Sequence, residues 1–365
     1  MTPPDPVCPV YDGPGVTSLV PALLGMTDGS WLPAAARDAN AVVLLVIDGL
    51  GWDAIGTHGP IVPTLAGMEG QAITTVAPST TAAALTSIAT GVAPSEHGLI
   101  GYRVRVDGHV LNALSWQSDA RRPPDPGLVQ RREPFRGRDV PVVTKAVFRS
   151  TGFTEAHLRG TRLVGWRTVS EIIEHCRLLV GAGERFVYAY YPGVDEVAHA
   201  HGLFDGFYVA ELGFADRLVA ALLDVLPDSA ALVVTADHGQ IHVGPDGWLP
   251  LGPFGELVDA CSGDGRFRFL HARRGAADEL YDAAKREHGD HAWVMSREEL
   301  LECGWLGPPP GAPVLRRIGD VVIAPFEPVA IIDEALPREA GLISAHGSLT
   351  AAEIEVPLLV GRGRA

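Results

Sequence analysis

AVVLLVID, residues 41–48, is the stretch that decides the fold. Its first seven residues are apolar and rich in valine, which is the pattern of a strand buried on both faces at the centre of a parallel sheet. The run ends at Asp48, and open α/β sheets bind their ligands at the carboxyl ends of such strands. Asp48 would equally serve to cap a helix over residues 52–57. This stretch alone leaves both roles open.

The composition excludes several classes of function. The chain has 365 residues, 47% of them hydrophobic, and it contains no run of about 20 apolar residues that would span a membrane. The formal net charge of −15 argues against a protein that coats nucleic acid, because that role needs a basic face. No secretory signal is visible, and the four scattered cysteines fit reduced thiols. We therefore predict a cytoplasmic protein without a membrane partner, and the oligomeric state stays open.

Strand and helix patterns alternate along most of the chain. This alternation predicts an α/β fold with a mostly parallel central sheet and helices on both faces. Residues 245–340 differ, because short mixed elements lie among glycine and proline turns, and we interpret them as a small α+β cap inserted in one catalytic domain over residues 1–365. Within the cap, residues 266–272 (RFRFLHA) alternate like a half-exposed strand, and we interpret Trp248, Phe254 and Arg266 as surface or core residues. The predicted strands of the main sheet cover residues 41–47, 71–76, 142–147, 185–191, 231–235 and 356–360, and the main helices cover residues 81–90, 168–180 and 204–226.

Residues 78–91 (PSTTAAALTSIATG) predict a tight turn followed by a helix. The helix begins at Thr81 or Ala82, runs through alanines and ends at Gly91. Hydroxyl residues at a helix start usually cap it. They also face free backbone N–H groups and the positive end of the helix dipole, which together form a seat for a phosphate.

Three aspartates and three histidines lie where predicted strands end or in nearby glycine-containing loops: Asp48, Asp195, Asp237, His199, His238 and His346. Asp195 and His199 are four residues apart, so both lie on one face of a helical turn. If the strands are parallel neighbours, all six side chains meet at one edge of the sheet. Their donors suit zinc-like divalent ions, and six ligands suit two ions with open positions. Two such ions can hold the attacking and leaving oxygens of a phosphoryl transfer.

Five motifs in this order resemble the alkaline phosphatase superfamily, and most closely its nucleotide pyrophosphatase/phosphodiesterase branch. They are DGLGW (48–52), PSTTAAALTSIATGVAPSEHGLIGY (78–102), GVDEVAHAHG (193–202), ADHG (236–239) and AHG (345–347). The resemblance implies that Thr81, ten residues before Gly91, is the nucleophile, and it implies a phospho-threonine intermediate. One zinc ion would be held by Asp195, His199 and His346. The other would be held by Asp48, Asp237 and His238, with Thr81 as a further ligand.

The resemblance is incomplete at the loop that would bind the substrate. The branch carries an asparagine about twenty-one residues past the nucleophile, where this chain has Tyr102, followed by Arg103. Both are candidate substrate-binding residues, and the tyrosine puts nucleotide specificity in question. The CxPxR motif of sulfatases is missing, and the insertion after the nucleophile is too short for the phosphoglycerate mutase branch. We therefore expect a small-molecule phosphate ester substrate and favour a diester. A phosphomonoesterase, a phosphonate hydrolase and a non-catalytic metal-binding relative are the alternatives.

Overall fold

The computed structural model describes residues 3–333 and 339–365. A seven-stranded sheet in the order β2-β18-β9-β1-β8-β6-β7 forms its centre. Strand β1, the stretch predicted as central, pairs in parallel with β8 on one side and β9 on the other. Strand β18 is antiparallel to both of its neighbours, so the other strands of this sheet share one direction. The strands are β2 (Glu69–Thr74), β18 (Glu355–Arg362), β9 (Ala230–Thr235), β1 (Ala41–Ile47), β8 (Phe186–Tyr191), β6 (Pro141–Lys145) and β7 (Arg162–Trp166).

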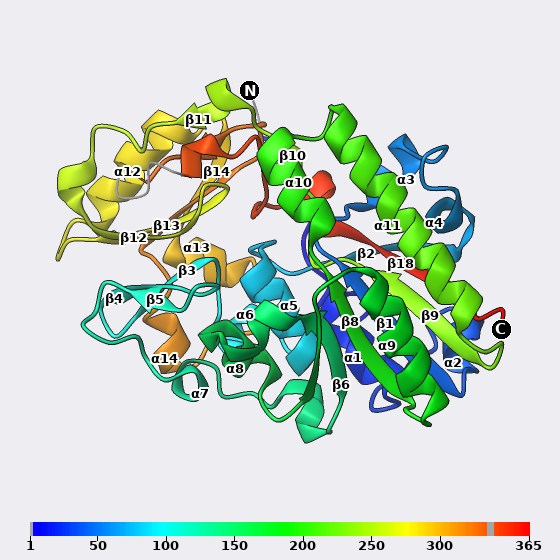
Figure 1. Ribbon diagram of the computed structural model, residues 1–365. Coiled ribbons are helices and arrows are strands. Elements are labelled where there is room, and N and C mark those ends of the chain that lie inside the picture. The colour runs from blue at the N-terminus through cyan, green and yellow to red at the C-terminus, as the bar shows by residue number, and fades with distance from the viewer. Residues whose placement is uncertain (1–2, 334–338) are drawn as a thin grey trace.

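Helices cover this sheet on both faces, as the alternating pattern predicted. Helices α9 and α11 lie side by side in front of the sheet in Figure 1, while α1 lies behind it and packs against α5. Apolar side chains from the sheet and these helices form one continuous core. The helices up to this point in the chain are α1 (Val16–Leu23), α2 (Ala34–Arg37), α3 (Trp52–Thr57), α4 (Pro63–Gly67), α5 (Thr81–Thr90), α6 (Pro94–His97), α7 (Pro126–Val129), α8 (Gly152–Leu158), α9 (Ser170–Gly181), α10 (Gly193–His201) and α11 (Gly206–Val225).

A second sheet lies beside the first in the order β12-β13-β15-β14, and all of its strand pairs are antiparallel. It falls within the stretch predicted as a cap and has a small apolar core of its own, which includes Leu270, Leu280 and Ile323. Residues 334–338 of the predicted cap lie outside the described residues. The elements of this part are β12 (Val258–Asp264), β13 (Phe267–Ala272), α12 (Ala277–His288), β14 (Ala292–Ser296), α13 (Arg297–Glu302), α14 (Ala312–Leu315) and β15 (Val321–Pro325).

Short strands and one short helix complete the frame around the site. Strand β10 (Ile241–His242) pairs with β17 (Ser344–Ala345), and β11 (Trp248–Leu249) pairs with β16 (Ala330–Ile331). A three-stranded sheet is formed by β3 (Arg103–Val106), β4 (His109–Asn112) and β5 (Gln117–Ser118), and the hairpin of β3 and β4 turns at Asp107-Gly108. Helix α15 (Ala351–Ile354) leads into β18. No helix in the described part of the chain is long and apolar enough to cross a membrane.

The prediction of a half-exposed strand over residues 266–272 is wrong. Strand β13 pairs with β12 and β15, and Arg266 and Arg268 have no exposed surface at all. Arg266 forms a two-point ion pair with Glu353, and Arg268 pairs with Glu339. Because carboxylates distant in the sequence neutralise these guanidinium groups, positions that look solvent-facing in the local pattern are buried.

Candidate active site

The six predicted ligand residues do meet at one edge of the main sheet. Asp48 directly follows β1, and Asp237 and His238 follow the neighbouring strand β9. Asp195 and His199 lie on α10, which begins just after β8 on the other side of β1. His346 follows β17, which is joined through β10 to the segment after β9.

One group consists of Asp48, Asp237 and His238, whose ligand atoms all lie within 4.8 Å of one another. His238 Nε2 is 3.3 Å from Asp48 Oδ1 and 3.6 Å from Asp237 Oδ2. The hydroxyl of Thr81 is 3.1 Å from the same nitrogen. Thr81, the predicted nucleophile at the start of α5, therefore lies beside one of the two predicted ligand sets.

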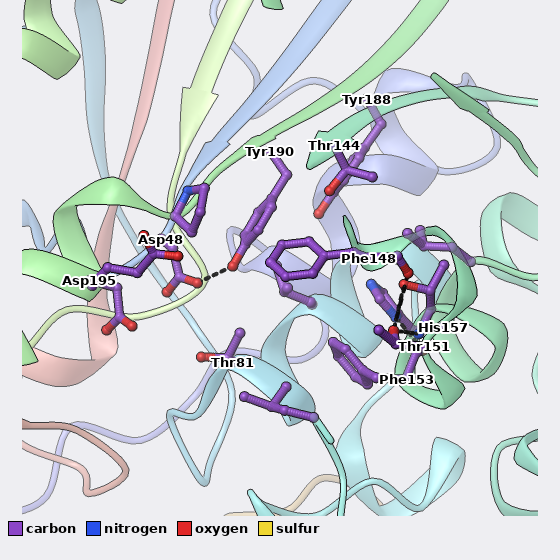
Figure 2. A pocket seen from close by; sticks show the side chains of 16 residues that line it. Asp48, Thr81, Thr144, Phe148, Thr151, Phe153, His157, Tyr188, Tyr190 and Asp195 are labelled. Carbon is purple, nitrogen blue, oxygen red and sulfur yellow. Dashed lines mark hydrogen bonds between the residues drawn. The ribbon is translucent and has the colours of Figure 1, made fainter. Parts of the chain in front are cut away.

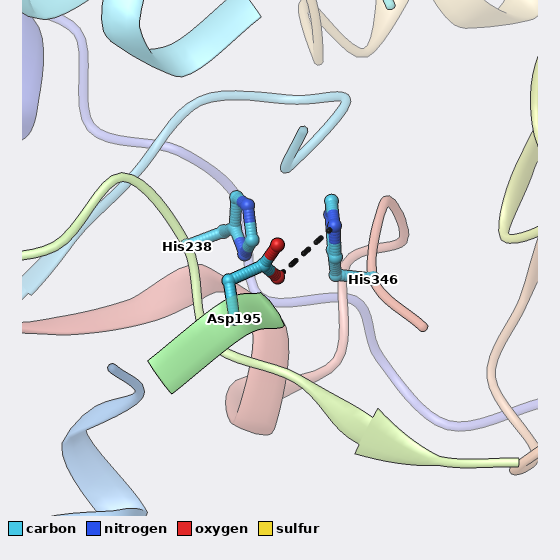
Figure 3. A group of neighbouring side chains, drawn as sticks. All are labelled: Asp195, His238 and His346. Carbon is cyan, nitrogen blue, oxygen red and sulfur yellow. Dashed lines mark ion pairs between the residues drawn. The ribbon is translucent and has the colours of Figure 1, made fainter. Parts of the chain in front are cut away.

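A second group combines Asp195 and His346 with His238 in place of His199 (Figure 3). The rings of His238 and His346 stack with their centroids 3.5 Å apart. His199 Nε2 nevertheless lies 3.3 Å from Asp195 Oδ1, and His346 Nε2 lies 3.8 Å from the same oxygen. All three predicted residues of this set are thus adjacent, and His238 lies between the two sets.

Backbone hydrogen bonds fix the ring orientation of the three histidines. His199, His238 and His346 each place Nδ1 within 2.9 Å of a backbone carbonyl oxygen. A carbonyl only accepts, so each Nδ1 carries a proton, and in the neutral ring Nε2 then presents a lone pair. These nitrogens face carboxylate oxygens, and Asp48 Oδ1 and Asp237 Oδ2 are buried without a hydrogen-bond partner among the described residues. Lone pairs that converge in this way fit divalent cations bound through nitrogen and oxygen, as zinc is.

The electrostatics indicate the same need for positive charge. Burial, followed by the nearby Asp237 and Asp195 carboxylates, raises the pKa of Asp48 well above its usual value. Burial also raises the pKa of Asp195 and of Asp237. Burial lowers the pKa of His238, and it lowers that of His346 further. Three buried carboxylates beside neutral imidazoles are unfavourable as anions unless cations compensate them.

A second layer of polar residues, which the sequence analysis missed, holds the aspartates. The Tyr190 hydroxyl donates to Asp48 Oδ2. Gln240 Nε2 donates to Asp195 Oδ1 over 2.7 Å, and the Ser344 hydroxyl donates in turn to the Gln240 side chain. Gly49 makes room for this contact, because a Cβ there would lie 2.4 Å from Gln240 Nε2. The position of Gln240 directly after ADHG was the only signal in the sequence.

The start of α5 keeps its backbone N–H groups free of side-chain caps. Thr80 is the N-cap residue but forms no capping hydrogen bond, and its hydroxyl is buried without a partner among the described residues. Thr81 is the first helical residue, and Gly91 ends the helix with a φ of 68°. The capping role considered for these hydroxyls is therefore not seen. The uncapped N-terminus remains available to an anion.

Two cavities meet at Thr81 and Asp195. One of about 280 Å³ extends between β8 and α8 and is lined by aromatic side chains that include Phe148, Tyr188 and Tyr190 (Figure 2). The other, of about 480 Å³, extends toward the second sheet and is lined by Tyr102, Trp248, Leu342 and other residues. Trp248 is buried in a small apolar cluster, in line with our interpretation, but it also lines this cavity, because residues far apart in the sequence close around it.

The two predicted substrate-binding residues differ in their placement. The Tyr102 hydroxyl accepts a hydrogen bond of 2.7 Å from Asn112 Nδ2, which leaves its own proton free to donate inside the larger cavity. Arg103 forms an ion pair with Asp333. Tyr102 is therefore available to a substrate, whereas the charge of Arg103 is already balanced.

Comparison with known families identifies the fold and the class of enzyme. The profile of the family described as type I phosphodiesterase / nucleotide pyrophosphatase matches residues 42–175 and 163–349. The chain belongs to this family. Its membership makes it a phosphoric ester hydrolase of the alkaline phosphatase superfamily, as the ordered motifs predicted. No curated protein sequence matches the chain significantly.

Solved structures share the fold of this phosphodiesterase-family chain at low sequence identity. Murine ectonucleotide pyrophosphatase/phosphodiesterase 5 is 17% identical, with a TM-score of 0.67 over 89% of this chain and 88% of that one. An inactive form of the same murine protein in complex with AMP is 16% identical, with a TM-score of 0.65 over 87% of each chain. Phosphonoacetate hydrolase from Sinorhizobium meliloti, in complex with phosphonoformate, is 19% identical, with a TM-score of 0.67 over 90% of this chain and 91% of that one.

Proposed function

We propose that this chain hydrolyses a phosphodiester at two divalent cations, zinc by the chemistry of the donors, with Thr81 as the nucleophile. The observation that carries the proposal is the position of the Thr81 hydroxyl. It lies at the uncapped start of α5, 3.1 Å from His238 Nε2, and it lines both cavities. A reacting phosphate placed over Thr81 would therefore have one cavity on each side.

The side chains have distinct tasks in this mechanism. Asp48, Asp237 and His238 would hold one ion, and Asp195, His199 and His346 the other. When bound, the ions would lower the pKa of the attacking hydroxyl groups and neutralise charge on the phosphate. Thr81 Oγ forms a bond to phosphorus as the P–O bond to the first leaving group breaks, and the proton of Thr81 passes through solvent to that leaving oxygen. Water then forms a new P–O bond as the P–Oγ bond breaks, and a proton from the water restores the Thr81 hydroxyl. The first-turn N–H groups of α5 and the Tyr102 hydroxyl would donate to the phosphate oxygens.

The two cavities favour a diester over the monoester and phosphonate alternatives. A diester carries two substituents, and Thr81 lies between a smaller aromatic cavity and a larger one that can hold them. A monoester carries an additional negative charge that would call for another cation, and Arg103, the candidate in the matching loop, is paired with Asp333. The AMP bound to the murine neighbour supports a nucleotide as one class of substrate to test.

The nucleophile is tested with two adjacent threonines. Thr81→Ala should lower kcat by about 10³-fold or more, as loss of a covalent catalyst does, while metal content and folding stay close to wild type. Thr80→Ala is the matched control and should change kcat by less than about tenfold, because its hydroxyl forms no hydrogen bond with the described residues. If Thr80→Ala were the inactive variant, Thr81 would not be the nucleophile.

The substrate class is tested by comparing two nitrophenyl esters under identical zinc concentrations. We expect kcat/KM for a nitrophenyl nucleotide diester to exceed that for nitrophenyl phosphate by at least about tenfold, or about 1.4 kcal/mol of transition-state binding. The physical reason is the second cavity, which only the diester fills. A clear preference for nitrophenyl phosphate would contradict the diester assignment and would leave the Thr81 mechanism intact.

A further inference from the structure

A third cavity, of about 750 Å³, lies apart from the two that Thr81 lines and shares no residue with them. It is formed by the turn between β3 and β4, by α7 and by the residues that follow α14. These elements lie close together at the lower left of Figure 1. Five arginines line it, and we call it the arginine cavity: Arg105, Arg131, Arg297, Arg316 and Arg317.

The charge of the arginine cavity is opposite to that of the protein. Five arginines face three aspartates there, whereas the chain as a whole has a formal net charge of −15. Two of the arginines have carboxylate partners, since Arg105 pairs with Asp259 and Arg297 pairs with Asp320. Among the described residues, the remaining three, Arg131, Arg316 and Arg317, form no ion pair.

None of the three aspartates of the cavity forms an ion pair with those three arginines among the described residues. Asp320 is the partner of Arg297. Asp125 caps α7 and accepts from the backbone N–H groups of Gly127 and Leu128. Asp107, in the hairpin turn, is thus the carboxylate that acts on Arg317, and Arg131 and Arg316 form no ion pair with a described residue.

Arg317 is held in this crowded position by the fold. The residue is 7% exposed, and its Nη1 donates to the carbonyl oxygens of Gly98 at 2.7 Å and of Val129 at 3.0 Å. Burial lowers the pKa of Arg317 to about 10, and repulsion from Arg131 and Arg316 acts in the same direction. A buried cation with two like charges beside it is unfavourable, and an anion in the cavity would relieve it.

We propose that the arginine cavity is a second binding site, separate from the catalytic centre, for a small molecule that carries a doubly charged phosphate group. Guanidinium groups bind phosphate oxygens in two-point contacts. Arg131 comes from the segment after α7, whereas Arg316 and Arg317 directly follow α14. A tetrahedral phosphate presents oxygens to guanidinium groups that approach from several directions, whereas a carboxylate presents only two oxygens in one plane.

The test is a calorimetric titration of the full, metal-loaded chain with inorganic phosphate at constant ionic strength. The double variant Arg131→Gln/Arg316→Gln changes two exposed side chains of the cavity, so it should fold. We expect it to lose one class of phosphate site, with affinity at that site falling at least tenfold. Without phosphate it should melt at the wild-type temperature or above, because repulsion at Arg317 is reduced.

The matched control is Arg121→Gln/Arg122→Gln, which removes the same charge from two exposed arginines outside the cavity. The control should keep every wild-type phosphate site. Wild-type phosphate binding in the Arg131→Gln/Arg316→Gln protein would overturn the proposal. An equal loss of phosphate binding in the control would also overturn the proposal, since phosphate would then respond to positive charge anywhere on the surface and not to this cavity. A combined Thr81→Ala variant should retain this phosphate site whether or not Thr81 is the nucleophile.

Discussion

At the scale of single residues, the geometry of the site depends on which side-chain atoms already form hydrogen bonds within the protein. The sequence analysis found the six ligand candidates and Thr81, because aspartates at strand ends and a hydroxyl at a helix start are local patterns. It did not find Tyr190, Gln240 or Ser344, which hold those ligands through contacts between distant segments. A hydrogen bond between residues far apart in the chain has no local pattern, so only the folded structure reveals it.

Gln240 gives the most direct test of this second layer. Replacing Gln240 by alanine should leave Asp195 without the hydrogen bond that orients it, and should lower metal affinity by about 10- to 100-fold. Wild-type protein should contain close to two divalent ions per chain, and the variant should lose one of them first during dialysis against a weak chelator. The readout is metal content by elemental analysis, which does not depend on turnover.

Gln71→Ala, at an exposed position of β2, is the control for this change and should keep both ions. If Gln240→Ala bound both ions as tightly as wild type, Gln240 would be a packing residue only. A single ion in the wild-type protein, unaffected by loss of Asp48, would contradict the binuclear arrangement itself.

At the scale of elements, the parallel strands were predictable and β13 was not. Uninterrupted apolar runs such as residues 41–47 identify buried strands directly, and the structure places β1, β8 and β9 side by side. Strand β13 contains Arg268 and follows Arg266, and arginines in an alternating pattern normally indicate a solvent-facing side. Their partners, Glu339 and Glu353, lie more than 70 residues further along the chain. The burial of β13 is thus decided by pairing that no short window contains.

The Arg266–Glu353 pair should be one of the most sensitive points of the fold. Both side chains are fully buried, and two nitrogens of Arg266 contact the two oxygens of Glu353 at 2.7 and 2.8 Å. Glu353→Gln would leave the guanidinium buried without its counter-charge and should destabilise the protein by about 3–5 kcal/mol. Urea denaturation followed by circular dichroism measures this difference.

An exposed ion pair provides the comparison for Glu353. Asp224 and Arg364 are 3.0 Å apart, with both side chains more than half exposed. Asp224→Asn should change stability by no more than about 0.5 kcal/mol. Equal effects of the two substitutions would show that the buried pair does not hold β13 against α15.

At the scale of the whole molecule, the order of the motifs predicted a parallel sheet with one reactive edge, and the family match agrees with it. The cavities were not predictable in the same way. The larger of the two cavities at Thr81 is closed by Trp248 and Leu342. These residues are almost one hundred positions apart in the sequence, and the fold brings them to the same wall of the cavity. The walls of this cavity therefore come from packing between segments distant in the sequence, whereas the candidate ligands lie at strand ends that a sequence pattern shows.

Stability against acid is a further property of the whole fold, and buried neutral histidines should limit it. Burial lowers the pKa of His157 to about 4, and its Nδ1 donates to the carbonyl oxygen of Phe153 over 2.7 Å. Above pH ~6.5 the residue is neutral in the folded and the unfolded chain alike. Between about pH 6.5 and 4 only the unfolded chain takes up the proton, so stability falls as the pH falls, by about 1.4 kcal/mol per pH unit.

His157→Asn should remove this dependence, because an asparagine amide can donate to the Phe153 carbonyl and does not titrate. Between pH 7 and pH 5 the wild-type protein should lose about 2 kcal/mol more stability than the variant, as measured by urea denaturation at each pH. His291→Asn replaces an exposed histidine and should follow the wild-type curve. Parallel curves for wild type and His157→Asn would mean that His157 titrates normally in the fold. The acid sensitivity would then have to come from other buried groups, of which His97, with a pKa lowered to about 3 mainly by burial, is the next to replace.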